Sequence, residues 1–434
     1  MKDKITISAT GDSLFVADIP GEYQEDMDVV GGFIKGCDVR ITNLETNISK
    51  FGDFPNAYSG GTWLNTEPEV FDDLTKYGFN YYGTANNHCM DYSYHGLIST
   101  LNELDKRGLS HSGTGLSLEE ASAPAVLDAK GNKVAIFAVT AEFQVASKAG
   151  VKTNTLAARP GVNYVGAKKY YNIDKNTLAQ LQEVAKNSQI NAYRELCIAG
   201  GFTLPDPEGV YNFGGINFCY DGSKKGSECD PADKERLTSA IKAAKEKYDY
   251  VLILIHCHDI KIDKHEDVPD YLEELSHACI DAGACAMIGG GTHQLRAIEI
   301  YKGCPIFYSL GDFIYQGMRV PILPADFMVK YGCDVNATAY EGLMARSKGG
   351  RIGLQAKKCN FMSVVPKMEF ENGKLVSLTM MPTVAGFDRI GKMNGLPYFA
   401  KGGEGRDIFD VLDRLSKVYG TKLSLENDMI KCQL

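Results

Sequence analysis

Four polar clusters contain the residues of this sequence that are best suited to chemistry. Each cluster follows residues with the pattern of a β-strand, and together they supply Asp, Glu, Asn and His side chains. They are Gly11-Asp12, Asn43-Leu44-Glu45, the run 85–91 with Asn87, His88 and Asp91, and His256-Cys257-His258-Asp259 with the run 289–293 that ends at His293. Oxygen ligands mixed with imidazoles suit Mn²⁺, Fe²⁺ or Zn²⁺ better than Ca²⁺ or a thiolate site. The clusters therefore predict a site for one or two divalent metal ions.

Each cluster also has a simpler interpretation when it is taken alone. An aspartate after a strand, such as Asp12, is commonly a turn former or a helix cap. Glutamate is common on protein surfaces, so Glu45 by itself carries little weight. A buried histidine such as His256 is more often only hydrogen-bonded. The joint pattern favours the metal site, because several separate strand ends each deliver a residue that can be a ligand.

The elements that must position these clusters alternate between strand and helix along the chain. Predicted strands cover residues 4–10, 39–44, 79–85, 134–140, 250–255 and 284–288, with a strand pair at 297–301 and 305–309. Predicted helices cover residues 67–77, 94–107, 174–196, 232–248 and 269–282. This alternation indicates an α/β layered sheet, in which ligands collect at the carboxyl ends of the strands. The polar clusters lie at those ends.

Two parts of the chain depart from this alternation. Residues from about 145 to 231 are less regular and rich in Asn, Gly and Tyr, which indicates an insertion that could form a lid or a substrate wall. Residues 331–434 add a few strands and a final helix at 406–418, and we expect them to pack against the main sheet. The expected organisation is a main domain at 1–330 that carries the insertion, followed by a C-terminal extension.

Composition limits the class of protein. Of the 434 residues, 44% are hydrophobic and 23% are charged, which is typical of a globular protein. The net charge of −9 gives no overall basic field that would attract nucleic acid. No run approaches the roughly 20 apolar residues that span a bilayer, and the start of the chain lacks the pattern of a signal peptide. These features predict a cytoplasmic protein with no nucleic-acid partner and no membrane span, and they leave the oligomeric state open.

The chain's twelve cysteines show no metal-binding or disulfide pattern. They are scattered from Cys37 to Cys432 without a C-x-x-C pair, so a zinc ribbon is not expected. Without a secretory leader, reduced thiols are expected in place of disulfides.

The order of the motifs resembles a known family. The runs "ATGD", "TNLET", "TANNHCMDY", "LILIHCHD" and "IGGGTHQLRAIEIYKGCPIFYSLGDFIY" are similar to those of the CapA (PGA_cap) family of poly-γ-glutamate capsule proteins. The resemblance extends from about residue 5 to residue 316, and its most specific parts are "ANNH-x-x-D" and "IEIYKG-x-PIFYSLG". That family is similar in fold to calcineurin-like metallophosphoesterases. The resemblance therefore implies a layered, metallophosphoesterase-like sheet sandwich flanked by helices.

The resemblance also implies roles for individual residues. The positions that match the family's metal-site motifs are Asp12, Glu45, Asn87, His256 and His293. His88 matches the histidine that would assist the leaving group or steady the charge of the transition state. Asp91 is expected to orient His88.

Two positions differ from the parent metallophosphoesterase pattern. Leu14 stands where a histidine usually follows the first aspartate, and Gly291 stands where a histidine usually precedes His293 by two residues. The loss at Gly291 puts a complete two-metal centre in doubt. His258 is an additional histidine two residues after His256, and in a strand these two would share a face. His258 could therefore replace the lost ligand, or it could contact substrate or nothing at all.

Three functions are compatible with these residues. The first is a metal-dependent hydrolase that cleaves a phosphoester or an amide, including a γ-glutamyl bond, in a small molecule or a polymer. The second is a non-catalytic partner in the synthesis or export of poly-γ-glutamate, which the missing histidine at Gly291 favours. The third is a phosphoesterase fold whose site is inactive. The metal content of protein purified without chelator distinguishes the first function from the others.

Overall fold

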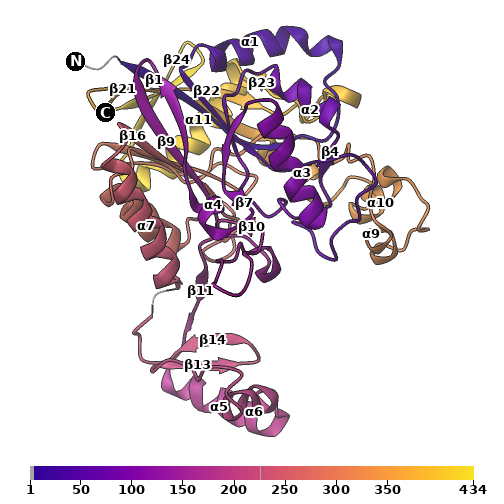
Figure 1. Cartoon of the computed structure of the whole chain (residues 1–434), viewed down its shortest axis with the longest axis vertical. Coiled ribbons are helices and arrows are strands. Elements are labelled where there is room, and N and C mark those ends of the chain that lie inside the picture. The colour runs from indigo at the N-terminus through magenta and orange to yellow at the C-terminus, as the bar shows by residue number, and fades with distance from the viewer. Residues whose placement is uncertain (1–3, 225) are drawn as a thin grey trace.

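The chain folds into a mixed α/β structure in which a large sheet contains both the first and the last strands of the chain (Figure 1). The computed structural model describes residues 4–224 and 226–434, so residues 1–3, part of the segment examined for a leader, lie outside it. Within these residues the first sheet has ten strands in the order β24-β25-β22-β21-β1-β2-β5-β6, with β20 beside β1 and β23 beside β22. The strands are β1 (Ile5–Leu14), β2 (Val39–Leu44), β5 (Tyr81–Gly83), β6 (Ser110–Ser112), β20 (Asp312–Tyr315), β21 (Met362–Glu371), β22 (Lys374–Val384), β23 (Tyr398–Phe399), β24 (Lys422–Glu426) and β25 (Met429–Gln433).

A second sheet of six strands has the order β18-β19-β17-β16-β9-β8. Its strands are β8 (Ala125–Ala129), β9 (Asn132–Thr140), β16 (Tyr250–His256), β17 (Ala286–Gly290), β18 (Ile298–Tyr301) and β19 (Cys304–Phe307). The central strands β9, β16, β17 and β19 run parallel, and every residue of β16 is buried. This burial explains the continuous apolar run of β16, because a central parallel strand is covered on both faces.

The two sheets share one hydrophobic core. A single cluster of buried residues includes Ile7 of β1 and Ile41 of β2 from the first sheet, and Ile136 of β9 and Leu252 of β16 from the second. Residues alternate between the two faces of a strand, so the chain neighbours of Ile136 and Leu252 belong to another cluster. Ile253, next to Leu252, packs in a cluster with helices on the opposite side of the second sheet.

Helices cover the faces of the sheets that point away from the shared core. On the second sheet these are α7 (Pro231–Lys245) and α8 (Asp270–Asp281), which contribute Ile241 and Leu275 to the cluster of Ile253. On the first sheet they are α1 (Gln24–Lys35) and α2 (Pro68–Thr75), which contribute Val30 and Phe71 to a third cluster. Burial of one apolar stripe per helix supplies the main force that holds these elements in place.

Part of the predicted insertion forms an arm that projects from the body (Figure 1). Residues up to 166 stay on the body, where β10 (Gly161–Val162) pairs with β7 (Thr114–Gly115). The arm starts where β11 (Ala167–Lys169) pairs with β15 (Ser227–Cys229), and it has its own small core of Tyr170, Val210 and Cys219. Beyond this stalk the arm contains β12 (Tyr171–Asn172), α5 (Lys175–Ser188), α6 (Ala192–Ala199), β13 (Val210–Phe213) and β14 (Ile216–Cys219).

The prediction of a single long helix at residues 174–196 is wrong, because two separate helices, α5 and α6, cover this range. Gln189 ends α5 in the left-handed conformation with φ of 58°. Asn191 donates to the carbonyl of Asn212 and accepts from the backbone N–H of Gly214. These contacts reach into the β13–β14 hairpin, so a tertiary interaction interrupts a locally continuous helical pattern.

The expected C-terminal extension, residues 331–434, enters the first sheet directly. β21 pairs antiparallel with β1, and β22 pairs with β21 over its length. β20 also pairs with β1, in parallel orientation. The segment 316–361, which connects β20 to β21, is therefore anchored at both ends to strands that pair with β1, the strand that contains Asp12. Among the described residues, no helix has both the length and the apolar composition that crossing a membrane requires.

We expect the arm to be dispensable for folding of the body. Because its core is separate from the clusters of the two sheets, replacing residues 170–226 by an Asn-Gly turn between the paired Lys169 and Ser227 should shift the thermal midpoint by less than about 4 °C. The control is Leu252→Ala in the shared core, which should cost about 2–5 kcal/mol of unfolding free energy. Equal losses in both variants, measured by calorimetry, would show that the arm is part of the core.

Candidate metal centre

Parallel strands of both sheets bring the predicted site residues to one place. Asp12 is in β1 and Glu45 directly follows β2, its parallel neighbour, in which Leu44 pairs with Ser13. His256 is the last residue of β16 in the second sheet. The strand ends meet because the faces of the two sheets pack on one core, and His256 Nδ1 lies 3.5 Å from Asp12 Oδ1.

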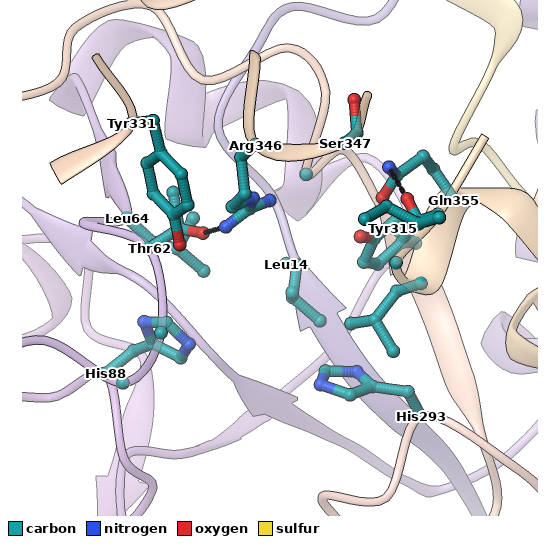
Figure 2. Close-up of a pocket in the computed structure, with 16 residues that line it drawn as sticks. Leu14, Thr62, Leu64, His88, His293, Tyr315, Tyr331, Arg346, Ser347 and Gln355 are labelled. Carbon is teal, nitrogen blue, oxygen red and sulfur yellow. Dashed lines mark hydrogen bonds between the residues drawn. The ribbon is translucent and has the colours of Figure 1, made fainter. Parts of the chain in front are cut away.

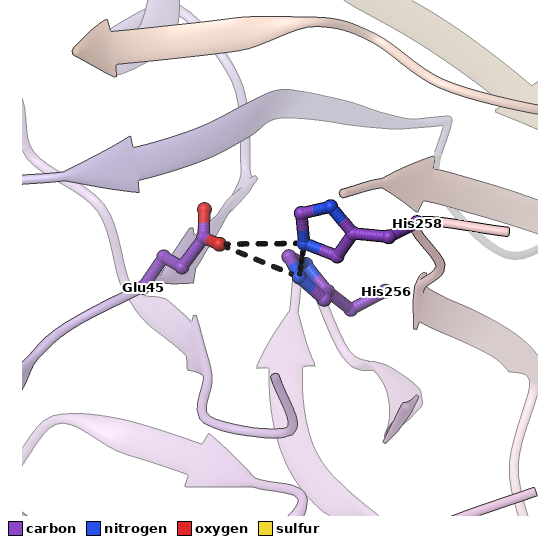
Figure 3. A group of neighbouring side chains, drawn as sticks. All are labelled: Glu45, His256 and His258. Atoms are coloured by element: carbon purple, nitrogen blue, oxygen red, sulfur yellow. Dashed lines mark hydrogen bonds and ion pairs between the residues drawn. The ribbon is translucent and has the colours of Figure 1, made fainter. Parts of the chain in front are cut away.

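Glu45, His256 and His258 form a compact group of three potential metal ligands (Figure 3). One ligand-type atom from each residue lies within 4.8 Å of the others. His256 Nε2 is 3.4 Å from Glu45 Oε1 and 3.0 Å from His258 Nε2, and His258 Nε2 is 4.0 Å from the same Glu45 oxygen. One oxygen of Glu45 and one ring nitrogen from each histidine therefore face one another, as the dashed lines in Figure 3 mark.

The carboxylate of Glu45 has no hydrogen-bond partner. Its side chain is fully buried, and both of its oxygens are without a donor among the described residues. Burial raises the pKa of Glu45 well above its ordinary value, and the nearby charges of Asp12, Asp312 and Asp91 raise it further. Burying an unpaired carboxylate costs several kcal/mol, at order of magnitude. A cation at this position removes that cost.

The geometry of the group fits a divalent metal. Ligands that bind Zn²⁺ at about 2.0–2.2 Å in a tetrahedral arrangement lie about 3.3–3.5 Å apart. The separations of 3.0, 3.4 and 4.0 Å in this group bracket that value. Two histidines and one carboxylate are also a donor set that Zn²⁺ and non-haem Fe²⁺ both accept.

His258 reaches the group from a loop. β16 ends at His256, so the strand periodicity that predicted a shared face does not extend to His258. Arg296, whose side chain is completely buried, donates to the backbone carbonyls of Asp259 and His265 and so holds both ends of this loop. Burial and the charges of the neighbouring histidines lower the pKa of His258 well below its ordinary value, so the ring is neutral and able to act as a ligand.

Asp12 lies beside this three-residue group and contacts His256. Its Oδ1 accepts from Asn43 Nδ2 at 2.7 Å, and the same amide nitrogen lies 3.2 Å from His256 Nδ1. Its Oδ2 accepts from the backbone N–H of Gly291 at 2.5 Å. Burial raises the pKa of Asp12, but His256 and the hydrogen bonds from Gly291 and Asn43 lower it more, so the net pKa lies below its ordinary value.

Backbone crowding explains why a glycine stands at 291. Its φ is +106°, and a Cβ there would lie 2.6 Å from the backbone nitrogen of Cys257. A histidine at this position would clash, and its place in the motif is taken by a backbone N–H that holds Asp12. Gly290, one residue earlier, is equally confined, because a Cβ would lie 2.4 Å from Asp12 Oδ1.

Asn87 and His88 lie in the turn between β5 and α3 (Ser93–Lys106). Asn87 Nδ2 donates to the carbonyl of Gly60, which leaves its buried Oδ1 without a partner among the described residues. His88 Nε2 lies 3.9 Å from Glu45 Oε1. Asn87 and His88 therefore both present atoms that are free to interact with a metal or a substrate.

Asp91 orients His88, as its motif implies. Its Oδ2 lies 2.6 Å from His88 Nδ1 and accepts from the backbone N–H of Leu64, while its Oδ1 accepts from the N–H of Gly60. Burial raises the pKa of Asp91, and His88 and these hydrogen bonds counteract only part of the effect. Asp91 thus connects His88 to the 60–64 loop.

His293 is near the group but is paired with an aspartate that the sequence analysis did not single out. Its ring centroid lies 5.1 Å from that of His258, and its Nδ1 lies 2.9 Å from Asp312 Oδ2. Burial raises the pKa of Asp312 to about 6, His293 counteracts this, and Asp12 adds to it. A signal was present in the sequence, since Gly311-Asp312 repeats the Gly11-Asp12 pair, and the two aspartates are cross-strand neighbours.

A pocket of about 400 Å³ opens beside these residues (Figure 2). His88 and His293 line one side of it, and Arg346, Ser347 and Gln355 line the other. The insertion was expected to supply a lid or a wall, but none of the described arm residues lines this pocket, and the wall comes from residues 315–355 instead. Sequence reasoning missed this wall because no local motif marks it.

In protein stripped of metal, Glu45→Gln should increase stability at neutral pH. The folded-state pKa of Glu45 is raised, so the stability that its protonation provides is lost as pH rises from its unfolded value through its folded value. The advantage of Glu45→Gln over wild type should therefore grow as pH rises above the ordinary pKa range of a glutamate, as measured by chemical unfolding with chelator present. Excess Zn²⁺ should make wild type the more stable of the two proteins, because it has the Glu45 carboxylate as a ligand and gains more stability from metal binding. Glu69→Gln on the surface of α2 is the control, and a pH-independent difference for Glu45→Gln would contradict the assignment.

Comparisons with known proteins agree with the motifs. The family described as bacterial capsule synthesis protein PGA_cap matches residues 6–317. Two uncharacterized proteins of Sinorhizobium fredii are each 30% identical to this chain over 98% of its length and 92% of theirs. The PGA biosynthesis protein CapA of Bacillus subtilis is 24% identical over 72% of this chain and 60% of its own length. The predicted resemblance is confirmed, and the chain belongs to the PGA_cap family of bacterial capsule synthesis proteins.

Proposed function

We propose that this protein is a metal-dependent hydrolase with a divalent ion held by Glu45, His256 and His258. The observation that carries the proposal is the buried Glu45 carboxylate, which has no hydrogen-bond donor and faces two imidazole nitrogens. Mn²⁺, Fe²⁺ and Zn²⁺ suit this donor set. Asn87 Oδ1 is a further oxygen for the same ion, because it is buried and unpaired. Asp12 and His293 are engaged with Asn43 and Asp312, so we assign them to holding the site in shape.

The chain's own residues supply the remaining parts of a hydrolytic site. A divalent ion activates water and polarises the oxygen of the bond that is cleaved. His88 lines the pocket, and its Nδ1 is held by Asp91, so its Nε2 is the atom that can pass a proton to a leaving group. Asp91 keeps the His88 ring in one orientation. Because Nδ1–H is donated to Asp91, the ring must be in its protonated form for Nε2 to give a proton to the leaving group.

The proposed substrates follow from the family. The matching family is described as bacterial capsule synthesis protein PGA_cap, and one relative is a PGA biosynthesis protein. We propose a role in poly-γ-glutamate metabolism, with cleavage of a γ-glutamyl amide or of a phosphoester. The shared core of the two sheets, with helices outside, is compatible with the metallophosphoesterase-like sandwich that we include in this proposal. If the protein binds metal without hydrolysing either bond, the non-catalytic role in capsule assembly replaces it.

Replacement of His258 should remove most of the bound metal. Its Nε2 is 3.0 Å from His256 Nε2 and 4.0 Å from Glu45 Oε1, so His258→Ala should weaken metal affinity by more than the 10- to 100-fold seen when supporting residues are lost. His265→Ala is the matched control, because this exposed histidine is in the same loop and only its backbone carbonyl is used. Bound metal per chain is measured by plasma emission after dialysis. Equal metal in both variants would show that His258 is not a metal ligand.

Replacement of His88 should reduce turnover without removing metal. Loss of a proton donor costs about 10²- to 10⁴-fold in kcat, and His88→Ala should show this on whichever substrate is active, bis(p-nitrophenyl) phosphate or γ-glutamyl-p-nitroanilide. His95→Ala, an exposed position in α3, is the control. Loss of kcat together with loss of metal would assign His88 to metal binding. An active enzyme whose kcat does not change in His88→Ala would contradict the proposed role.

A further inference from the structure

The wall of the pocket opposite the histidines belongs to one segment of the chain. Residues 316–361 connect β20 to β21, and both strands pair with β1, so this segment lies over the carboxyl end of β1. It contains α9 (Ala325–Lys330), α10 (Ala339–Arg346) and a short 3-10 helix (Leu354–Ala356). Asn360 fixes it to the site, because it accepts from Gln294 and donates to the carbonyl of Leu354. The wall is therefore a built part of the site.

Arg346 brings an unneutralised positive charge to this pocket. It is the last residue of α10, and its guanidinium points into the pocket between Tyr331 and Ser347 (Figure 2). It donates to Thr62 Oγ1 and lies 5.5 Å from the ring centroid of Phe327. In the part of the chain that the structure describes, no carboxylate forms an ion pair with it. A guanidinium is always charged and has five N–H donors, so most of its donors remain available to a ligand.

The surroundings of Arg346 suit an oxyanion. Tyr331 and Gln355 line the same wall and add a hydroxyl and an amide group. Ser347 also lines it, but its hydroxyl already donates to the carbonyl of Met344. The opposite side of the pocket has the buried carboxylates of Glu45, Asp91 and Asp312 behind the histidines. These carboxylates are engaged with histidines, so an anionic group in the pocket would be attracted to the unneutralised charge of Arg346. Arginine is also the residue that binds carboxylate and phosphate groups in two-point geometry.

Glycines keep the space between the two sides open. A Cβ on Gly60 would lie 2.7 Å from both Asn87 Nδ2 and His88 Nε2, so only glycine leaves these atoms accessible from the pocket. Thr62, in the same loop, is the residue that Arg346 contacts. One ligand can thus reach the His88 side and the Arg346 side of a pocket of about 400 Å³, a volume typical of small-molecule sites.

We propose that Arg346 forms an oxyanion-binding subsite for a carboxylate or phosphate group of the substrate that is separate from the bond being cleaved. That the bound anion belongs to a substrate rests on the proposed hydrolase function. Anion binding itself requires neither metal nor turnover. The subsite lies beyond residues 6–317, where the family's model ends. The C-terminal part of the chain therefore determines which acidic molecules the pocket accepts.

The test measures anion binding to chelator-treated, full-length protein by titration calorimetry. The probes are glutarate, inorganic phosphate and glutaramide, which is the neutral counterpart of glutarate. Wild type should bind glutarate or phosphate and should not bind glutaramide. Binding of glutarate alone assigns a carboxylate subsite, and binding of phosphate alone assigns a phosphate subsite. Binding of neither anion, or equal binding of glutaramide, would overturn the proposal.

Three variants separate anion binding from a purely structural role of Arg346. Arg346→Gln should lower the affinity for the anion by about tenfold or more, because a charged hydrogen bond is lost. Arg346→Lys retains the charge and should bind with intermediate affinity, which keeps the test decisive if Arg346→Gln is unstable. Thr62→Val removes the hydrogen bond to Thr62 but leaves the charge, and it should bind nearly as wild type does. Equal weakening by Thr62→Val and Arg346→Gln would show that Arg346 only fastens α10 to the loop.

A matched control and the metal content complete the design. Arg351→Gln removes an exposed arginine of the same segment whose guanidinium contacts only the carbonyl of Lys348 among the described residues, and it should bind anions as wild type does. If Arg351→Gln lowers anion affinity as much as Arg346→Gln does, the loss reflects the net charge of the protein. That result would overturn the proposed subsite. Failure of the hydrolase proposal would appear instead as absent metal or absent turnover in wild type, with anion binding intact.

Discussion

A buried carboxylate without a hydrogen-bond donor is the constraint on which the rest of this site depends. Glu45 follows β2 with both oxygens shielded from water, and its Oε1 faces His256 and His258. The donors nearby are already used, since Asn43 and the N–H of Gly291 both serve Asp12. Such an arrangement is costly for an ionised carboxylate and favourable once a cation is shared with the imidazoles. The site is therefore built for charge neutralisation by something that binds.

The supporting network explains how the fold tolerates this arrangement. Two sheets with a shared core bring the ends of β1, β2 and β16 together, and small residues let the backbones approach closely. Gly11 is the clearest case, because a Cβ there would lie 1.6 Å from the carbonyl oxygen of Gly311. That contact places Asp12 beside Asp312, and these two aspartates in turn hold His256 and His293. Strands thus fix the positions of Asp12, His256 and Asp312, and this rigid framework favours a preorganised site.

The pocket separates the parts of the chain that carry chemistry from those that select the ligand. His88 and His293 come from strand-end motifs that the family's model covers. Arg346 and its neighbours come from a segment outside that match, anchored at both ends to β1. Members of one family can therefore keep the strand-end residues and vary the opposite wall, as functional sites on shared folds commonly do. The arm at residues 167–229 takes no part in this wall among the described residues.

Local sequence determined the elements and the chemical types at their ends. The strand predicted at residues 250–255 and the helix predicted at 232–248 agree closely with Tyr250–His256 and Pro231–Lys245, because hydrophobic periodicity reports burial residue by residue. The positions of Glu45 and His256 at strand ends could be predicted for the same reason. The first strand was expected to end at residue 10, but β1 continues to Leu14 and contains Asp12, because β2 and β20 pair with it there. The convergence of these three residues could be expected from the topology of parallel strands, whose carboxyl ends share an edge.

Only the tertiary structure decided what each of these side chains does. Asp12 supports His256 because Asn43 and Gly291 reach it from other strands. His258 joins the group through a loop that the distant Arg296 holds. The break between α5 and α6, the pairing of His293 with Asp312 and the place of Arg346 in the pocket also rest on contacts between residues far apart in the chain. Periodicity and motif spacing carry no information about such contacts, since they depend on how completed elements pack.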